Sequence, residues 1–213
     1  GFTIDNINTA LIGEFDFLEF KEYSYKNINV NGVYQNKLFD GDLTVDDENL
    51  KMSFKGLADL SSEIYRFDFN STIDFAELNQ LNFFKRDSIS IFKGNINFDL
   101  QGNNINNLVG IANFKNTSYQ NINDTYDFKQ FLVLSKVIDN IRKIRVDSED
   151  IVSGELEGDF NFEDFVPLAQ NALGSIYTNY TPYKLAEHRF IEFDLRIYSQ
   201  LGEVFFPEVK VAT

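Results

Sequence analysis

The sequence has no cysteine and no tryptophan, and it contains only 3 prolines and 1 histidine. Without cysteine the chain has no disulfide framework, no zinc–thiolate site and no thiol nucleophile. The histidine, His188, stands between Glu187 and Arg189. That setting is typical of a surface residue rather than of a base that activates a nucleophile. These absences argue against nucleophilic catalysis.

Basic residues are also scarce: 19 Lys and Arg stand against 33 Asp and Glu, which gives a formal net charge of −14. A nucleic-acid-binding protein needs a basic surface to displace counterions from phosphates, so this class is excluded. The same charge opposes docking on an anionic membrane surface. No run approaches the roughly 18 apolar residues that span a bilayer, and no signal peptide opens the chain.

Acidic residues are numerous enough to raise two further possibilities, a catalytic carboxylate pair and a calcium site. Most carboxylates alternate with apolar residues, so we expect them on the solvated side of strands. Asp40, Asp42 and residues 46–48 lack the spacing and the central glycine of a calcium-binding loop. No glycine-rich phosphate loop precedes a helix. We therefore expect no enzymatic activity, no cofactor and no metal ion.

Phenylalanine and tyrosine are abundant, with 23 and 10 residues in a chain that is 43% hydrophobic. This composition argues against intrinsic disorder, and these aromatic side chains suit the half-buried surface of a strand. Asparagine is frequent where strands would turn. With 213 residues, the chain is long enough to bury a sizeable core. Composition alone therefore predicts a β-rich protein.

Four consecutive segments, 39–46, 50–56, 65–75 and 92–100, alternate apolar and polar residues with a period of two. Such alternation is the signature of antiparallel strands with one covered face and one hydrated face. An acidic turn at 46–49 separates the first two, and an Asn/Gly turn at 101–104 follows the last. We predict an all-β antiparallel fold.

Further strands are predicted at 107–116, 126–136, 141–147, 151–162 and 187–198. Residues 164–177 instead repeat apolar side chains at three- and four-residue steps, with Asp164 as a cap and Pro182 beyond the end. We predict one short helix there, interrupting a single continuous unit over residues 1–213. Both ends of the chain look like cut strands, so we expect a fragment of a larger protein.

Three stretches resemble the TamB/AsmA-like family, the envelope-spanning β-groove proteins of Gram-negative bacteria. Each consists of period-two alternation punctuated by glycines, and the order of the stretches carries the resemblance. The first comprises residues 41–56, 65–69 and 74–81, the second 94–102 and 106–111, and the third 141–148, 154–160 and 201–209.

This resemblance implies an elongated antiparallel half-pipe, called a β-taco, with an apolar interior. It implies a segment of a periplasmic conduit that carries phospholipid between the inner and outer membranes and supports outer-membrane assembly. A membrane anchor, and a contact with an outer-membrane β-barrel assembly partner, would lie outside the fragment. Twelve residues are expected to line the groove and bind acyl chains: Leu43, Val45, Leu50, Met52, Phe54, Phe67, Phe69, Ile73, Phe75, Ile96, Phe98 and Leu100.

The alternation has a second interpretation. The same apolar side chains would fill the closed core of a β-sandwich, such as an extracellular adhesion or glycan-binding module. The absence of tryptophan argues mildly against glycan stacking. Whether the apolar face is covered by a second sheet or by lipid is not decided by the residues alone.

Overall fold

A computed structural model of the chain describes residues 8–85, 87–164, 167 and 189–198. These residues form eleven β-strands and one 3₁₀ turn, η2 (Phe162–Asp164). The strands are β1 (Asn8–Phe20), β2 (Tyr23–Gln35), β3 (Leu38–Asp46), β4 (Leu50–Asp59), β5 (Arg66–Glu77), β6 (Ile91–Gln101), β7 (Val109–Gln120), β8 (Thr125–Ile138), β9 (Ile141–Asp147), β10 (Val152–Asp159) and β11 (Phe190–Ile197). The predicted all-β antiparallel class is confirmed.

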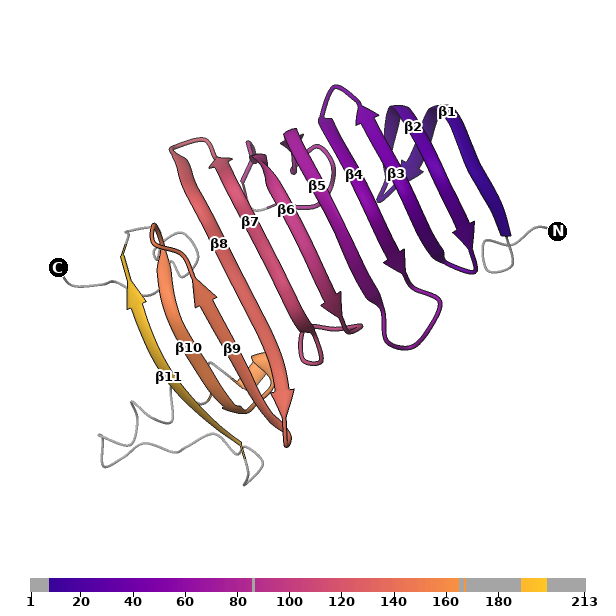
Figure 1. The fold of residues 1–213 in the computed structure, drawn as a ribbon. Helices are drawn as coiled ribbons and strands as arrows, with labels where there is room; N and C mark the ends of the chain where they lie inside the picture. The colour runs from indigo at the N-terminus through magenta and orange to yellow at the C-terminus, as the bar shows by residue number, and fades with distance from the viewer. Residues whose placement is uncertain (1–7, 86, 165–166, 168–188, 199–213) are drawn as a thin grey trace.

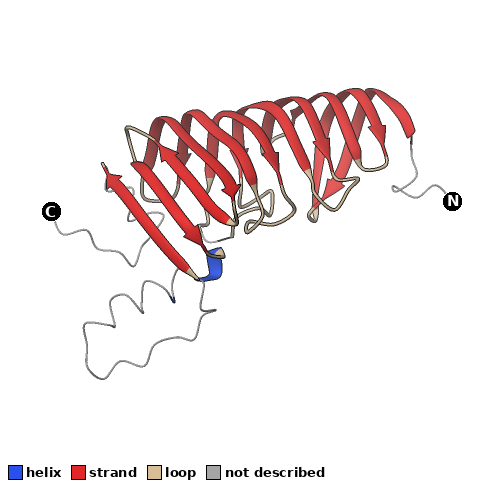
Figure 2. Cartoon of the chain, turned by 60° about the horizontal axis from the view of Figure 1, so that its bottom comes forward, coloured by secondary structure: helices blue, strands red, loops and turns tan. Residues whose placement is uncertain are grey.

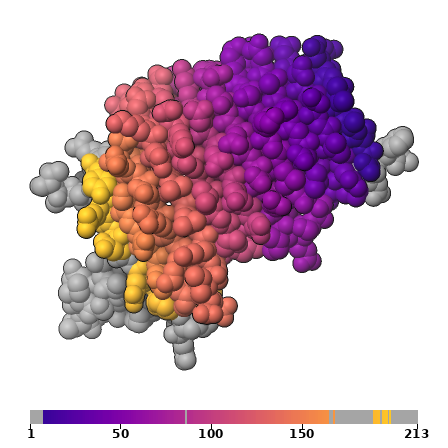
Figure 3. All heavy atoms as spheres, viewed as in Figure 1, coloured from indigo at the N-terminus to yellow at the C-terminus, as the bar shows by residue number. Residues whose placement is uncertain are grey.

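The strands form one open sheet whose order in space is their order in the sequence (Figure 1). Each hydrogen-bonded neighbour is antiparallel, and most connections are hairpins. In the space-filling view the strands follow one another as successive bands of colour across the visible face (Figure 3). The segments predicted from alternation correspond to β3, β4, β5 and β6.

No second layer packs on this sheet within the part of the chain that the structure describes. Strands make substantial contacts only with their immediate neighbours in the sheet. A β-sandwich requires a second sheet facing the first at about 10 Å. The described residues therefore form a single sheet rather than a sandwich.

The sheet is curved, and Figure 2 shows its strands bent along their length. Register shifts interrupt the ladder between β4 and β5 and again between β6 and β7. Such bulges bend a strand and increase its local twist. Glycines in positive-φ conformations, such as Gly56 in β4 and Gly110 in β7, lie within the strands and also permit bending.

Two strands, β1 and β2, are not predicted by the alternation. Tyr25 and Ile28 in β2 are both buried in the same cluster, although they are three positions apart in the sequence. Asn27 between them has a left-handed φ of 52°, and the strand switches face at that residue. The switch interrupts the period-two alternation of apolar and polar residues, so the sequence does not predict β2.

The predicted helix at 164–177 lies almost wholly outside the described residues and stays a prediction. Immediately before it, residues 162–164 form the 3₁₀ turn η2. The predicted turns at 46–49 and 101–104 both connect strands.

Candidate functional site

The cross-strand register places apolar side chains of successive strands on one face of the sheet, which we call the apolar face. Leu43 of β3 pairs with Phe54 of β4, and Phe69 of β5 pairs with Phe98 of β6. Paired residues of an antiparallel sheet project to the same side. Of the twelve predicted lining residues, eleven share this face: Leu43, Val45, Leu50, Met52, Phe54, Phe67, Phe69, Ile73, Ile96, Phe98 and Leu100.

Phe75 is the exception, and its predicted position is wrong. A bulge in β5 pairs Ala76 with Leu50 and Phe75 with Lys51. Lys51 is exposed and forms an ion pair with Asp46 on the opposite face. Ala76, which the alternation assigns to the polar side, is instead buried in the core. One extra residue in a strand is sufficient to move every following side chain to the other face of the sheet.

A row of phenylalanine rings crosses the apolar face from β3 to β8. The ring centroids of Phe54 and Phe69 are 4.8 Å apart, and those of Phe69 and Phe98 are 5.2 Å apart. Tilted and edge-on contacts of this kind are the favoured geometries of aromatic pairs. All members of the row remain partly exposed: Phe39, Phe54, Phe69, Phe98, Phe114 and Phe131.

The opposite face of the sheet is polar. Asn97 donates a hydrogen bond to Asn70 across β5 and β6 at 2.8 Å, and Lys55 forms an ion pair with Asp42 at 3.1 Å. These side chains are exposed, so each pair contributes little to stability. Solvent covers the polar face, whereas the apolar face has no second sheet over it within the described residues.

The loop between β5 and β6, described at residues 78–85 and 87–90, folds over one end of the apolar face; we call it the strap. Its Leu81 is 1% exposed and lies in a cluster with side chains of β2, β3, β4 and β5. The amide of Asn82 donates to the Lys21 carbonyl at 2.9 Å, which joins the strap to the turn between β1 and β2. Phe83 contacts Phe20, with ring centroids 6.3 Å apart. The strap therefore spans from β5 to the β1–β2 hairpin.

Arg142 of β9 holds a second loop, between β6 and β7. Arg142 lies opposite Gly158 on the apolar face and is 5% exposed. It donates to the Leu108 carbonyl at 3.0 Å, to the Ser135 hydroxyl at 3.1 Å and to the Asn106 carbonyl. Burial lowers the pKa of this guanidinium, which stays charged because arginine ionises only at very high pH. These hydrogen bonds fix the loop to the sheet.

A buried carboxylate fixes the hairpins at the strap end. Asp47, which is 2% exposed, accepts hydrogen bonds from the Tyr23 hydroxyl at 2.5 Å, the Lys26 amide at 3.0 Å and the Asn49 amide at 2.9 Å. Burial and the neighbouring carboxylate raise the pKa of Tyr23 to about 12. Asp47 thereby connects the β3–β4 turn to β2.

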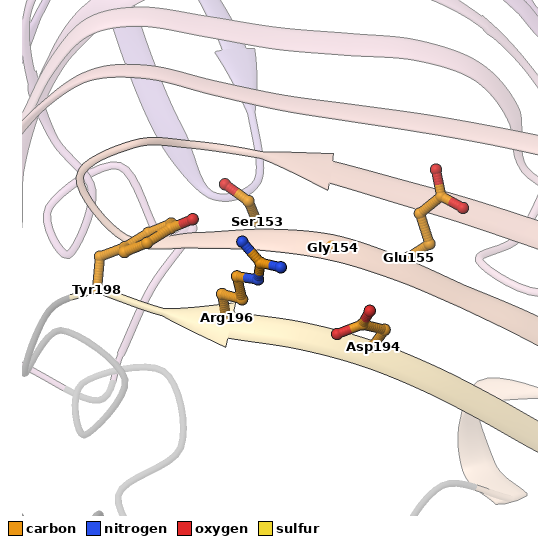
Figure 4. Close-up of a pocket in the computed structure, with 6 residues that line it drawn as sticks. All are labelled: Ser153, Gly154, Glu155, Asp194, Arg196 and Tyr198. Carbon is orange, nitrogen blue, oxygen red and sulfur yellow. The ribbon is translucent and has the colours of Figure 1, made fainter.

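The polar face carries a separate hollow. Residues of β10 and β11 form a shallow depression of about 280 Å³ at the edge of the sheet (Figure 4). Glu155 of β10 and Asp194 of β11 are paired in the register there, and Arg196 of β11 also lines the depression. These side chains project from the polar face, so this depression is separate from the aromatic row.

Sequence reasoning missed several residues of the candidate site. Phe114 and Phe131 lie within the predicted strands 107–116 and 126–136, and Phe39 lies in the first alternating segment, but none of the three is among the predicted lining residues. The strap residues Leu78 and Leu81 give no periodic signal because they lie in a loop.

Within the described residues, no three His, Asp or Glu side chains are grouped as metal ligands, and no helix is long and apolar enough to span a membrane. Comparison of the chain with protein-family models, with curated protein sequences and with solved structures finds no match. The functional argument therefore rests on the geometry of the sheet.

Proposed function

We propose that the chain is a segment of a lipid conduit, in which the apolar face binds acyl chains. The observation that carries the proposal is an eleven-stranded sheet with a continuous apolar face and no second sheet over it in the described residues. Contiguous exposed apolar surface of this extent marks an interaction site in soluble proteins. In this proposal the apolar face lies on the inside of the curve, which makes the sheet a half-pipe groove that resembles the TamB/AsmA-like type.

The energetics favour an acyl chain as the occupant. Transfer of one methylene group from water to an apolar surface contributes roughly 0.8 kcal/mol. An acyl chain of ordinary length that lies in the groove therefore gains on the order of 10 kcal/mol. Hydrophobic burial has no preferred direction, so a lipid can move along the groove without a unique stopping point. A conduit needs this property, and it requires no catalytic residue.

The aromatic row has a length that suits this role. It crosses six strands, from Phe39 in β3 to Phe131 in β8. With about 4.8 Å between neighbouring strands, the row spans roughly 24 Å, comparable to an extended acyl chain. In the cell, we place this segment in the periplasm, between an inner-membrane anchor outside these residues and the outer membrane.

The alternative, a β-sandwich for adhesion or glycan binding, requires a second sheet. The described residues contribute all eleven strands to one sheet. The lipid-conduit proposal is therefore the one that we carry forward.

The proposal is tested by measuring lipid bound to protein that has been purified without detergent. The protein is incubated with vesicles of phosphatidylethanolamine and phosphatidylglycerol, separated from them and analysed by native mass spectrometry. We expect bound phospholipid on the wild-type chain. Phe69→Arg places a charge in the centre of the aromatic row and should reduce the bound fraction by about tenfold or more.

Asn70→Arg is the matched control, because Asn70 is the next residue of β5 and is exposed on the polar face. It should bind as much phospholipid as the wild type. Circular dichroism checks that each variant keeps its β-structure. A lipid-free wild type, or an equal loss of lipid in both variants, contradicts the proposal.

A further inference from the structure

Arg142 of β9 is a buried cation that no carboxylate neutralises within the described residues. It is 5% exposed on the apolar face, and its hydrogen-bond acceptors are two backbone carbonyls and one hydroxyl. Glu163, which approaches the same loop, accepts hydrogen bonds from the Asn106 side-chain amide instead. A buried charge is costly unless an opposite charge or a full set of hydrogen bonds compensates it. An anionic ligand would compensate the charge of Arg142.

The hydrogen bonds of Arg142 use only part of its guanidinium, which carries two protons on each Nη atom and one on Nε. Nη1 donates both of its protons, one to the Leu108 carbonyl and one to the Ser135 hydroxyl. Nη2 donates one proton to the Asn106 carbonyl, and Nε donates to no residue in the described part of the chain. The second Nη2 proton and the Nε proton therefore remain available.

These two protons lie on the same edge of the guanidinium, which we call the open edge. Such an edge binds an oxyanion through two parallel hydrogen bonds. The described side-chain atoms that are buried without a hydrogen-bond partner are Tyr25 Oη, Asn113 Oδ1, Thr117 Oγ1 and Ser148 Oγ. Nε of Arg142 is not one of them, so this atom reaches the solvent-accessible surface although most of the residue is buried.

The open edge lies close to the aromatic row. Ser135 follows Phe131, the last ring of the row, by four residues of β8, and both project from the apolar face. At about 3.3 Å per residue, Phe131 and Ser135 are roughly 13 Å apart along the strand. Gly158, opposite Arg142, and Gly110, opposite Ser135, add no side chain beside them. A phospholipid with its acyl chains on the aromatic row can therefore extend its headgroup to Arg142.

We propose that the open edge of Arg142 binds the phosphate of a phospholipid whose acyl chains lie along the aromatic row. This inference rests on the proposed function and adds a headgroup site to it. Acyl-chain burial does not distinguish one lipid class from another, because it has no directional contacts. Arg142 supplies that distinction, since a lipid without a phosphate leaves the open edge unpaired. Free inorganic phosphate has the same chemistry, so the experiment includes it.

The test compares two lipids that carry the same fluorescent acyl chain: phosphatidylethanolamine, and diacylglycerol, which lacks the phosphate. Fluorescence titration of the wild type should give about tenfold tighter binding of phosphatidylethanolamine, as expected for charge-assisted hydrogen bonds. Equal affinities for the two lipids overturn the phosphate site and leave the lipid-conduit proposal intact. Binding of neither lipid overturns the lipid-conduit proposal, and the phosphate site with it.

Arg142→Gln should weaken binding of phosphatidylethanolamine by about tenfold and leave binding of diacylglycerol unchanged. Arg145→Gln is the matched control, because Arg145 lies in the same strand but projects from the polar face opposite Glu155, with its side chain 60% exposed. It removes the same charge and should keep the wild-type preference. Equal weakening of both lipids by Arg142→Gln would mean that Arg142 only fixes the loop, and an equal effect of Arg145→Gln would indicate general electrostatics; either result overturns the proposal.

A measurement on the wild type keeps the test decisive if Arg142→Gln does not fold. In a ¹⁵N–¹H NMR spectrum the Nε–H signal of Arg142 should shift when phosphatidylethanolamine is added and stay in place when diacylglycerol is added. Inorganic phosphate at millimolar concentration should weaken binding of phosphatidylethanolamine without affecting diacylglycerol. A signal that shifts with inorganic phosphate but not with phosphatidylethanolamine assigns the site to free phosphate and overturns the lipid headgroup, and a signal that shifts with neither overturns the anion site.

Discussion

Gly110 in β7 has a φ of 120°, a conformation that residues with a side chain rarely adopt. A Cβ atom at this position would lie 2.0 Å from the backbone oxygen of Asp99 in the neighbouring strand β6. Backbone atoms cannot move aside without disturbing the ladder. Gly110 therefore permits both the local backbone conformation and the close approach of β6 and β7.

We predict that Gly110→Ala destabilises the fold by about 3 kcal/mol, because a backbone clash adds to the 1–3 kcal/mol of conformational strain. Gly13→Ala is the matched control: Gly13 has a φ of 155°, and its Cβ would meet no atom within 4 Å. The control should cost less than Gly110→Ala. Urea denaturation of both variants measures the two free energies of unfolding, and equal losses would show that the Asp99 contact is unimportant.

The hydrogen bond between Tyr23 and Asp47 gives a pH dependence of stability. The folded pKa of Tyr23, about 12, lies above the ordinary tyrosine value near 10, so folding favours the neutral phenol. The corresponding stabilisation is complete below pH 10 and is lost as the pH rises from about 10 through 12. Desolvation and the buried carboxylate both act in this direction.

Tyr23→Phe should therefore lower the free energy of unfolding at pH 8 by roughly 1–3 kcal/mol, since Asp47 loses one of its hydrogen bonds. The difference from the wild type should shrink towards pH 12. Urea denaturation across this pH range measures it. A difference that is constant from pH 8 to pH 12 would contradict the assigned role of the Tyr23 hydroxyl.

At the scale of the strands, the sequence predicts an element well where its alternation is unbroken. In β3, β4 and β6 the apolar and polar residues keep one parity over residues 39–46, 50–56 and 92–100, and both the strand and its apolar face follow from that pattern. In β5 the inserted residue before Ala76 reverses the faces, and in β2 the left-handed Asn27 does so. Asparagine does not by itself reveal whether it lies in a turn or in a strand that changes face.

The strap is an element that no periodicity predicts, yet it contains the most buried apolar side chain of the core. Leu81→Ala should cost about 2–5 kcal/mol, because the cavity would lie among residues of four strands. Leu60→Ala is the control, since Leu60 lies in another loop and is 42% exposed; it should change stability by no more than about 0.5 kcal/mol. Thermal or urea unfolding compares the two. A small effect of Leu81→Ala would mean that the strap is not part of the folded core.

At the scale of the whole molecule, the sequence cannot distinguish an open sheet from a sandwich. Both architectures place apolar residues on one side of every strand, and the alternation of β3 to β6 is compatible with either. The difference lies in what covers the aromatic row, and no residue of the row specifies that. The tertiary arrangement therefore has to come from the structure.

A single sheet in which strands contact only their neighbours has a further consequence for cooperativity. Stability is then approximately a sum of local terms, as in repeat proteins, and a weakened strand has little effect on distant ones. The core cluster around Leu81 lies over β2 to β5, whereas Ile144 is buried in β9, near the other end. These two positions report on opposite parts of the sheet.

We predict that Leu81→Ala accelerates amide hydrogen exchange in β2 to β5 by about tenfold or more and leaves β8 and β9 nearly unchanged. Ile144→Ala should do the reverse, with faster exchange in β8, β9 and β10. Native-state hydrogen exchange with peptide-level mass spectrometry measures both patterns in one experiment. If either substitution accelerates exchange equally in every strand, the sheet unfolds as one cooperative unit, and the nearest-neighbour description is wrong. The reverse patterns in the two variants would show that strands more than a few positions apart in the sheet are energetically independent, as a sheet without a covering second layer requires.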